Sequence, residues 1–203
     1  MTQQALTTVT NGKDDKEKDE SKSARGGLDD KLFNARAITI FGEINDKIAR
    51  SVTERLLALA AANDEPISIY ISSPGGHVES GDVVYDMIKF IKPTVRVIGT
   101  GWVASAATTI YLAAAKENRF ALPNTRFLVH QPSGGSRGSA TDIAIQAQEI
   151  VKMRARINQL IADETGQPLD RVAQDTDRDY WMSAGEAIDY GIVGRIVKSV
   201  EEI

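Results

Sequence analysis

The segment IGTGWVASAATTIYLAAA, residues 98–115, joins two kinds of structure in one apolar stretch. The β-branched residues Val95 and Val97 that precede it are typical of the end of a strand. The Ala- and Leu-rich run from Ser105 to Ala115 favours a buried helix. Glycines lie between the two, so we expect a glycine turn that ends just before Ser105. A hydroxyl at that place lies next to the free backbone N–H groups of a helix start.

Strands and helices alternate along the rest of the chain. Runs of β-branched and aromatic residues predict strands, and apolar residues at a spacing of about 3.6 predict amphipathic helices. The expected strands cover residues 37–42, 66–72, 94–99, 119–123 and 126–130, and the expected helices cover residues 45–63, 84–91, 105–115, 141–164 and 183–190. Strand–helix repeats of this kind predict right-handed βαβ crossovers and a mainly parallel sheet, so the fold class is α/β.

The helix expected over residues 141–164 is long and carries apolar side chains on a wide face. Gly166 ends this helix, and Pro168 prevents its continuation. A projecting helix with so wide an apolar face usually needs a partner chain to cover it. We therefore expect the protein to be a homo-oligomer.

Composition separates a charged N-terminal segment from the remainder. Residues 1–28 are rich in Lys, Asp and Glu, which predicts a flexible tail, and residues 29–203 form the expected folded domain. The net charge of −4 argues against binding nucleic acid, and no apolar run is long enough to span a bilayer. The start lacks the features of a signal peptide, so we expect a cytoplasmic protein. The chain has no Cys, which excludes thiolate catalysis, disulfides and cysteine metal sites.

Ser105 and the two histidines are the groups best suited to acyl-transfer chemistry. A serine hydroxyl is a weak nucleophile at neutral pH and needs a base to take its proton. His130 ends an expected strand before a glycine-rich loop, so it is better placed than His77 to face a cleft. Lys116 lies about 16 Å from Ser105 along the expected helix, which excludes it as a local base. A purely structural role for each of these residues is the alternative interpretation.

Three aspartates at alternate positions, Asp175, Asp177 and Asp179, could orient the imidazole of a catalytic histidine. Such a run is also typical of a solvated acidic turn. Tyr180 and Trp181 follow directly, so the end of the run enters an apolar environment. We therefore expect Asp179 to be the buried and hydrogen-bonded member of the three.

The segment SSPGG, residues 72–76, supplies backbone donors that no side chain obstructs. One of its N–H groups, with that of the residue after Ser105, would form a two-donor oxyanion hole. Removing one such donor costs about 2.7–4 kcal/mol. An ordinary tight turn is the alternative. The chain lacks the phosphate-loop patterns, so nucleotide binding is not expected, and its widely separated histidines predict no metal site.

Four motifs resemble, in order and spacing, the proteolytic subunits of the Clp protease family (ClpP). They are YISSPGG (70–76), FIKPTVRVIGTGWVASAA (90–107), RFALPNTRFLVHQPSGGSRGSATDI (119–143) and DTDRDYWMSAGEAIDYGIV (175–193). The resemblance extends from Leu32 to Val197. It implies a crotonase-like (ClpP) fold of repeated βαβ units with a projecting handle helix. It also implies rings of seven subunits stacked into a barrel.

The same resemblance implies roles for five residues of the site. Ser105 matches the nucleophile, His130 the general base, and Asp179 the third member of the triad. Gly76 and Ala106 match the donors of the oxyanion hole. The implied activity is a serine endopeptidase that cleaves unfolded polypeptides inside a closed chamber.

Other matches concern assembly and partners. Asp142 and Arg178 resemble the charged pair of the ring–ring contact, and Tyr70 and Phe90 match apolar positions that receive an AAA+ ATPase. The implied partners are copies of this chain in two stacked heptameric rings, a Clp-type AAA+ unfoldase and, as an alternative, a ClpP paralogue. ATP is then used by the partner ATPase, and this subunit needs no cofactor.

The chain departs from the family pattern in two places. The family's GQAAS reads GWVAS here, so Trp102 brings a large ring near Ser105 and is expected to reshape the substrate pocket. The apolar axial-loop segment of the family is not recognisable in residues 11–27. These departures leave open a structural or regulatory ring subunit paired with a paralogue, and the fold alone leaves open a crotonase-like enzyme acting on acyl-CoA thioesters.

Overall fold

The computed structural model describes residues 27–135 and 137–203, and the chain divides into two units at Ala35. In the first unit, residues 27–34 are helical and mostly exposed. The predicted flexible tail, residues 1–28, lies outside the described residues except for its last two. Its flexibility therefore stays a prediction.

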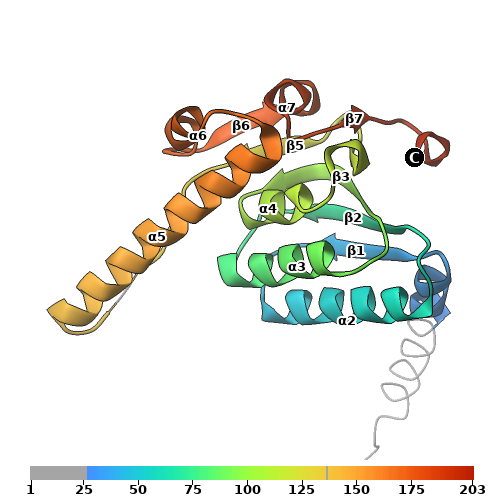
Figure 1. Cartoon of the computed structure of the whole chain (residues 1–203), viewed down its shortest axis with the longest axis horizontal. Helices are drawn as coiled ribbons and strands as arrows, with labels where there is room; N and C mark the ends of the chain where they lie inside the picture. Colours follow the sequence, from blue (N-terminus) through green and yellow to red (C-terminus); the bar gives the residue numbers. More distant parts are fainter. Residues whose placement is uncertain (1–26, 136) are drawn as a thin grey trace, which may run out of the picture. The chain divides into compact units, whose positions relative to one another are not determined.

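The second unit, Arg36–Ile203, is built on a sheet flanked by helices (Figure 1). The strands are β1 (Ala37–Phe41), β2 (Ile67–Ser73), β3 (Val95–Ala104), β4 (Arg119–Ala121), β5 (Arg126–Val129), β6 (Tyr180–Ser183) and β7 (Arg195–Ile196). The helices are α2 (Asp46–Ala62), α3 (Val78–Phe90), α4 (Ala106–Leu112), α5 (Ala140–Thr165), α6 (Leu169–Asp175) and α7 (Ala184–Tyr190), with short 3-10 turns at Lys116–Asn118 and Val200–Glu202.

The sheet is mainly parallel, as the strand–helix order predicts. Strands β1, β2, β3, β4 and β7 follow one another in parallel. The second half of β3 leaves β4 and pairs in parallel with β5, and β6 then pairs with β5 in antiparallel orientation. The predicted α/β fold of repeated βαβ units with a projecting helix is thereby confirmed.

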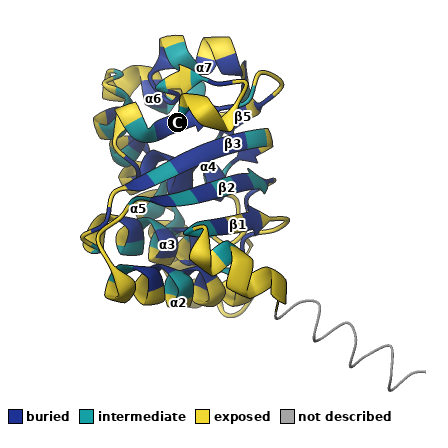
Figure 2. Ribbon diagram, turned by 90° about the vertical axis from the view of Figure 1, so that its right-hand side faces the viewer, coloured by how far each residue is buried: buried dark blue, intermediate teal, exposed yellow. Residues whose placement is uncertain are grey.

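One face of the sheet carries most of the core. The inward side chains of β1 and β2 alternate with half-exposed ones, as a period of two requires, and Ile38, Ile40 and Ile69 are almost fully buried. Helices α2 and α3 cover this face with Leu56, Leu59, Val84 and other apolar residues of the same cluster. In Figure 2 the central strands are mostly dark blue, the colour of buried residues, and the outer faces of the helices are yellow, the colour of exposed residues.

Strand β3 differs from the sequence expectation. It continues through Gly99 and Gly101 to Ala104, so the predicted glycine turn is wrong. The register of the two strands shows why. Ile71 of β2 faces Gly99 of β3, and Ser73 of β2 faces Val103 of β3, so a step of two residues along β2 corresponds to a step of four along β3. The glycines therefore absorb extra backbone inside the strand, and Gly101 does so at a φ of +62°. This irregularity redirects the end of β3 from β4 to β5.

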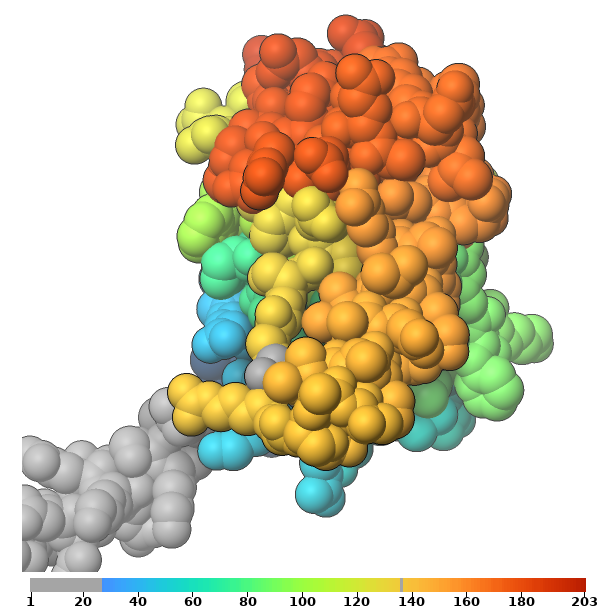
Figure 3. All heavy atoms as spheres, turned by 90° about the vertical axis from the view of Figure 1, so that its left-hand side faces the viewer, coloured from blue at the N-terminus to red at the C-terminus, as the bar shows by residue number. Residues whose placement is uncertain are grey.

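Helix α5 projects from the sheet (Figure 1). Only its last turns are buried, through Ile157, Ile161 and Ala162, whereas Ile145 and Val151 in its first half are 51% and 67% exposed. The predicted stop at Gly166 is confirmed by a left-handed cap. Figure 3 shows the segment after β5 running beside the helix toward its tip.

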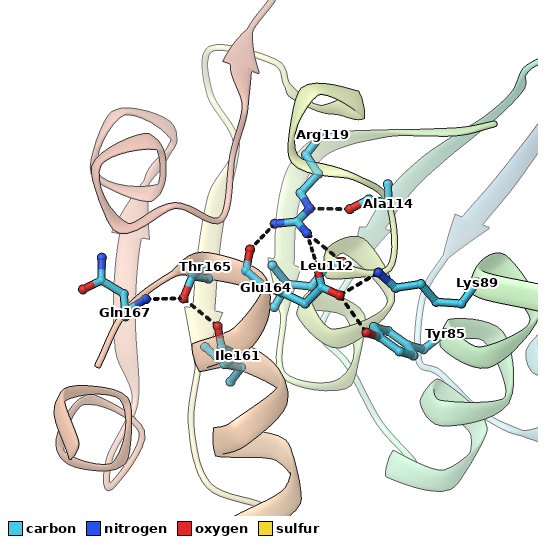
Figure 4. A network of polar contacts seen from close by, with 9 residues as sticks. All are labelled: Tyr85, Lys89, Leu112, Ala114, Arg119, Ile161, Glu164, Thr165 and Gln167. Atoms are coloured by element: carbon cyan, nitrogen blue, oxygen red, sulfur yellow. Dashed lines mark hydrogen bonds and ion pairs between the residues drawn. The ribbon is translucent and has the colours of Figure 1, made fainter. Parts of the chain in front are cut away.

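The base of α5 is fixed by a buried arginine (Figure 4). Arg119 of β4 is 1% exposed. Its guanidinium donates to the carbonyl oxygens of Ala114 (2.6 Å), Leu112 (3.0 Å) and Glu164 (2.8 Å) and pairs with the Glu164 carboxylate. One buried cation therefore ties the end of α5 to α4 and to the segment that follows it.

Glu164 also reaches helix α3. Its carboxylate accepts hydrogen bonds from Tyr85 (2.9 Å) and from Lys89 (2.6 Å). Burial by itself would raise the pKa of Glu164, but the bonds from Lys89 and Tyr85 and the charge of Arg119 outweigh it, so this pKa lies below its ordinary value. The carboxylate is therefore charged at neutral pH.

We expect Glu164→Gln to lower the free energy of unfolding by about 1–3 kcal/mol at pH 7, because three donors lose a charged acceptor. A lowered pKa contributes stability above the ordinary value of 4.5, and this contribution is lost as the pH falls through the folded-state pKa. The difference between wild type and variant should therefore narrow below pH 4.5. Urea denaturation followed by circular dichroism at pH 7 and in acid measures it.

The matched control is Glu149→Gln on the exposed part of the same helix. Its ion pair with Lys152 is solvated, since the two side chains are 56% and 70% exposed, so we expect a change below about 1 kcal/mol. The account of the network would be contradicted if both variants lost the same free energy of unfolding. It would also be contradicted if the difference between wild type and Glu164→Gln stayed the same in acid.

Candidate active site

Three side chains that are far apart in the sequence converge at the ends of β3 and β5 and the start of β6. The Nε2 atom of His130 lies 2.8 Å from the Ser105 Oγ, and its Nδ1 atom lies 2.9 Å from an Asp179 carboxylate oxygen. The strand register explains the meeting. Val129 of β5 faces Tyr180 of β6 in antiparallel orientation. His130, the residue after Val129, therefore lies opposite Asp179, the residue before Tyr180.

The backbone of Ser105 is held in an unusual conformation. Its φ of +57° and ψ of −125° are rarely adopted by a residue with a side chain, and such conformations cost on the order of 1–3 kcal/mol. The Ser105 N–H donates to the Leu128 carbonyl at 3.0 Å, and its carbonyl accepts from the Thr108 N–H at 2.9 Å. The Thr108 hydroxyl adds bonds to the carbonyls of Val103 and Leu128. These bonds hold the hydroxyl at a sharp strand-to-helix turn.

Asp179 is hydrogen-bonded as expected, but its predicted burial is wrong. Its side chain is 64% exposed, whereas that of His130 is 27% exposed. The aspartate precedes β6 at the free edge of the sheet, so the apolar residues after it do not enclose it. Gln131 fixes the loop before Asp179 through its N–H to the Thr176 carbonyl (2.6 Å) and its side chain to the Asp177 carbonyl (2.7 Å).

The Pro-Gly-Gly turn lies directly against the serine. A Cβ added at Gly75 would lie 2.6 Å from Ser105 Cβ and 2.6 Å from the Ala104 carbonyl oxygen. A Cβ at Gly76 would lie 2.3 Å from the Ile44 carbonyl oxygen. The sequence assigns no role to Gly75, and only the Pro-Gly-Gly pattern could have indicated that it contacts the serine.

The backbone donors of Gly76 and Ala106 directly follow the two residues in close contact, Gly75 and Ser105. Among the described residues, neither the Gly76 N–H nor the Ala106 N–H has a hydrogen-bond acceptor. The same positions match oxyanion-hole donors in the sequence. Free donors beside a hydroxyl are suited to stabilising an oxyanion that forms on an attacked carbonyl group.

Two hollows meet at His130. The first has mostly apolar walls, and its lining residues are Val78, Ser105, Ala106, Thr108, Thr109, Val129, His130, Pro132, Ile157 and Ile161. The second is polar and is lined by His130, Gln131, Pro132, Ser133, Asp177, Arg178 and Asp179. The apolar hollow lies directly beside the serine hydroxyl.

The structure of one chain does not bring Asp142 and Arg178 together. Asp142 lies at the tip of α5, where its carboxylate accepts bonds from the Ser139 hydroxyl (2.7 Å) and N–H (3.2 Å). These bonds, the hydroxyl first, lower the pKa of Asp142. Arg178 is exposed in the loop before β6, and no ion pair joins it to Asp142 within the described parts of the chain.

Tyr70 and Phe90 also lie on different surfaces. Tyr70 of β2 packs against a small cluster on the second face of the sheet, formed by Ile98, Phe120 and Val197. Phe90 ends α3 and is 79% exposed. Tyr70 is half-buried and Phe90 is exposed, so both are accessible for a partner.

Two further residues singled out by the sequence lie outside the triad. His77 hydrogen-bonds Ser80 at 2.8 Å and pairs with Glu79, so it belongs to the start of α3. Trp102 is 43% exposed and stacks on Trp181 with ring centroids 6.4 Å apart. It does not line the apolar hollow, and its effect on the substrate pocket stays a prediction.

Two negative findings apply to residues 27–135 and 137–203. None of their helices combines the length and the apolar character that crossing a membrane requires. No three of their His, Asp and Glu side chains are grouped in a way that could hold a metal ion.

Comparisons with known proteins give consistent results. The family model described as Clp protease matches residues 21–200. A relative from Rhizobium etli, named ATP-dependent Clp protease proteolytic subunit 3, is 63% identical over 172 residues, covering 85% of this chain and 89% of the relative. A Pseudomonas aeruginosa relative, named ATP-dependent Clp protease proteolytic subunit 2, is 46% identical over 94% of this chain and 96% of its own length. The solved structure of ClpP1 from Listeria monocytogenes has a TM-score of 0.79 and 54% identity, covering 86% of this chain and 98% of that one.

Proposed function

Because this chain belongs to the Clp protease family, we propose that Ser105, His130 and Asp179 are the catalytic triad of a serine endopeptidase subunit. The chain is a Clp-type serine peptidase with the ClpP (crotonase-like) fold. Neither a purely structural subunit nor an acyl-CoA enzyme is favoured. The observation that carries the residue assignment is the unbroken hydrogen-bond chain from the serine hydroxyl through the imidazole to the carboxylate.

The first step is acylation of the serine. In the tautomer with its proton on Nδ1, His130 donates to Asp179 and presents a free Nε2 lone pair to the Ser105 hydroxyl. Nε2 takes the hydroxyl proton while Oγ attacks the peptide carbonyl carbon. The resulting imidazolium then gives that proton to the leaving amine, and the C–N bond breaks to leave an acyl-enzyme.

The second step is hydrolysis of the acyl-enzyme. Water enters on the leaving-group side and gives a proton to His130 Nε2 as its oxygen attacks the ester carbon. Collapse of the tetrahedral intermediate returns the proton to Ser105 and releases the carboxylic acid. In both steps the negative charge develops on the former carbonyl oxygen, and we assign its stabilisation to the N–H groups of Gly76 and Ala106.

Assembly and partners follow from family membership as proposals. The exposed apolar residues in the first half of α5, Ile143, Ile145 and Val151, support the burial of this helix against copies of the chain. Asp142 at the same tip and Arg178 are assigned to the contact between two stacked heptameric rings. Tyr70 and Phe90 are assigned to the docking of a Clp-type AAA+ unfoldase, which supplies unfolded polypeptides and uses the ATP. The subunit then needs no cofactor of its own, and we expect it in the cytoplasm.

Asp179→Asn tests the third member of the triad. The amide NH₂ of Asn cannot accept the Nδ1 proton when it faces the ring, so the productive tautomer is disfavoured. In serine proteases with an enclosed aspartate this change costs about 10⁴ in kcat. Because Asp179 is 64% exposed and its charge is screened by solvent, we expect a smaller loss in kcat, about 10- to 100-fold, with KM unchanged.

The measurement is steady-state cleavage of a fluorogenic peptide by the assembled protein. Asp170→Asn, an exposed aspartate of α6, is the control and should retain wild-type kcat. If Asp179→Asn lowered kcat by less than twofold, Asp179 would have no part in the mechanism.

A further inference from the structure

The two tryptophans of this chain form one exposed patch with an arginine. The rings of Trp102 and Trp181 are parallel to within 2°, with centroids 6.4 Å apart, and they remain 43% and 37% exposed. The guanidinium carbon of Arg126 lies 4.3 Å from the centre of the Trp181 ring. We call these three residues the tryptophan patch. Large apolar groups on a surface mark binding sites when they are grouped in this way.

Strand register places the tryptophan patch on the same strands as the triad. Trp102 of β3 faces Arg126 of β5, and Leu128, two residues further along β5, faces Trp181 of β6. His130 follows Leu128 by two residues, and Asp179 precedes Trp181 by two residues. Since side chains two apart lie on one face of a strand, the patch and the His130–Asp179 pair share one face of β5 and β6.

The distance between the tryptophan patch and Ser105 equals the length of a few extended substrate residues. Trp102 is three residues before Ser105 on the same chain, and a strand rises by about 3.3 Å per residue, so the two are separated by roughly 10 Å. A polypeptide extended along this face passes the patch about three residues from the bond that Ser105 attacks.

The chemistry of the patch suits a large apolar or aromatic side chain. Indole faces stack on aromatic rings and cover aliphatic ones. The guanidinium of Arg126 lies over the Trp181 ring, and no carboxylate pairs with it among the described residues. The apolar hollow beside Ser105 is formed by other residues, so the patch is a separate contact for substrate.

We propose that Trp102, Arg126 and Trp181 form a subsite that binds a large apolar or aromatic residue of the polypeptide substrate, about three residues from the scissile bond. This inference rests on the proposed peptidase function. The patch is a specificity determinant: it takes no part in proton transfer, and it selects which segment of an unfolded chain is held over Ser105.

Intrinsic fluorescence tests the proposal directly, because Trp102 and Trp181 are the chain's 2 tryptophans and all tryptophan emission comes from the patch. The protein is the assembled full chain carrying Ser105→Ala, which holds peptide without cleaving it. The probes are alanine-rich decapeptides with one fixed leucine as a reference position and a phenylalanine moved through the four positions on either side.

We expect saturable quenching or shift of the emission, with binding about threefold to tenfold tighter for peptides that carry Phe three residues from the leucine. Unchanged emission at saturating peptide, or equal affinity for every position of Phe, would overturn the proposal. The proposal would also be overturned if the emission changed when the protein was diluted but not when peptide was added, because a second copy of the chain would then cover the patch.

Kinetics on the protein with Ser105 intact separate this proposal from the proposed function. Trp181→Ala should raise KM about threefold to tenfold for the preferred Phe peptide, leave KM for the all-alanine version unchanged, and leave kcat unchanged; Trp181→Phe should restore KM. Val200→Ala, another exposed apolar residue, is the control and should change nothing. An unchanged KM with normal cleavage overturns the subsite alone. Binding as expected without any cleavage overturns the peptidase function alone.

Discussion

Ser105→Ala is expected to reduce peptide cleavage by at least about a thousandfold while the assembly and its melting temperature are retained. The hydroxyl is the only part of the side chain that is removed, and the strained backbone turn is held by bonds from main-chain groups and from Thr108. The variant keeps any rate acceleration that the oxyanion hole and substrate binding provide, so some cleavage above the uncatalysed rate is compatible with the mechanism.

The measurement is the hydrolysis rate of a fluorogenic peptide at equal subunit concentration, with gel filtration of both proteins. Ser51→Ala on the exposed surface of α2 is the matched control and should keep the wild-type rate. Residual cleavage by Ser105→Ala within tenfold of wild type would remove Ser105 as the nucleophile.

Gly75→Ala is expected to reduce kcat/KM by about a hundredfold or more, although Gly75 donates no group to the reaction. A methyl group there would lie 2.6 Å from Ser105 Cβ and from the Ala104 carbonyl oxygen, so the serine or the turn must move. A displacement of about 1 Å in an active site can cost 10²-fold in rate. The φ of +90° at Gly75 adds backbone strain for Ala, so the melting temperature should fall as well.

Gly185→Ala is the matched control for this change. Gly185 lies within α7, and a Cβ added there meets nothing within 4 Å. Ala is the better helix former by about 1 kcal/mol, so this variant should be as stable as wild type or more stable, with full activity. A Gly75→Ala protein that is folded and cleaves peptide at the wild-type rate would show that the turn does not constrain Ser105.

Much of the fold is predictable because local and tertiary preferences agree. The helix ending at Gly166 has a cap that only a left-handed residue provides, and the sequence supplies glycine there. The same holds for the helix predicted from residue 183, where Ser183 is the N-cap and forms a capping box with Glu186. In β1, which the sequence predicts as a strand, Ile38 and Ile40 lie inside and alternate with outward residues.

The missed elements depend on partners far away in the sequence. Glycine normally ends a strand, but Gly99 and Gly101 lie inside β3, because the strand must bulge to change its partner from β4 to β5. Strand β6 is short and is defined by pairing with β5, which no local pattern reveals. Helix α6 has Val172 as its buried residue, too little for an amphipathic pattern.

The residues of the candidate site were predictable from the sequence, but their exposure was not. The chemistry of serine, histidine and aspartate and their motifs pointed to Ser105, His130 and Asp179, and the strand register brings these three together. Exposure could not be read from the neighbours of Asp179, since Tyr180 and Trp181 belong to an edge strand whose outer face is open. The contact of Gly75 with the serine follows from the path of two loops, which composition does not encode.

Labelling with a serine-reactive phosphonate tests the central claim most directly, because the reagent reacts with a hydroxyl that a neighbouring base activates. The assembled wild type and the Ser105→Ala variant are incubated with the reagent, and intact masses are followed by peptide mapping. The account predicts one adduct per wild-type subunit, located on Ser105, and none on the variant. Wild-type protein that acquires no adduct, or a variant labelled as fully as wild type, would contradict it.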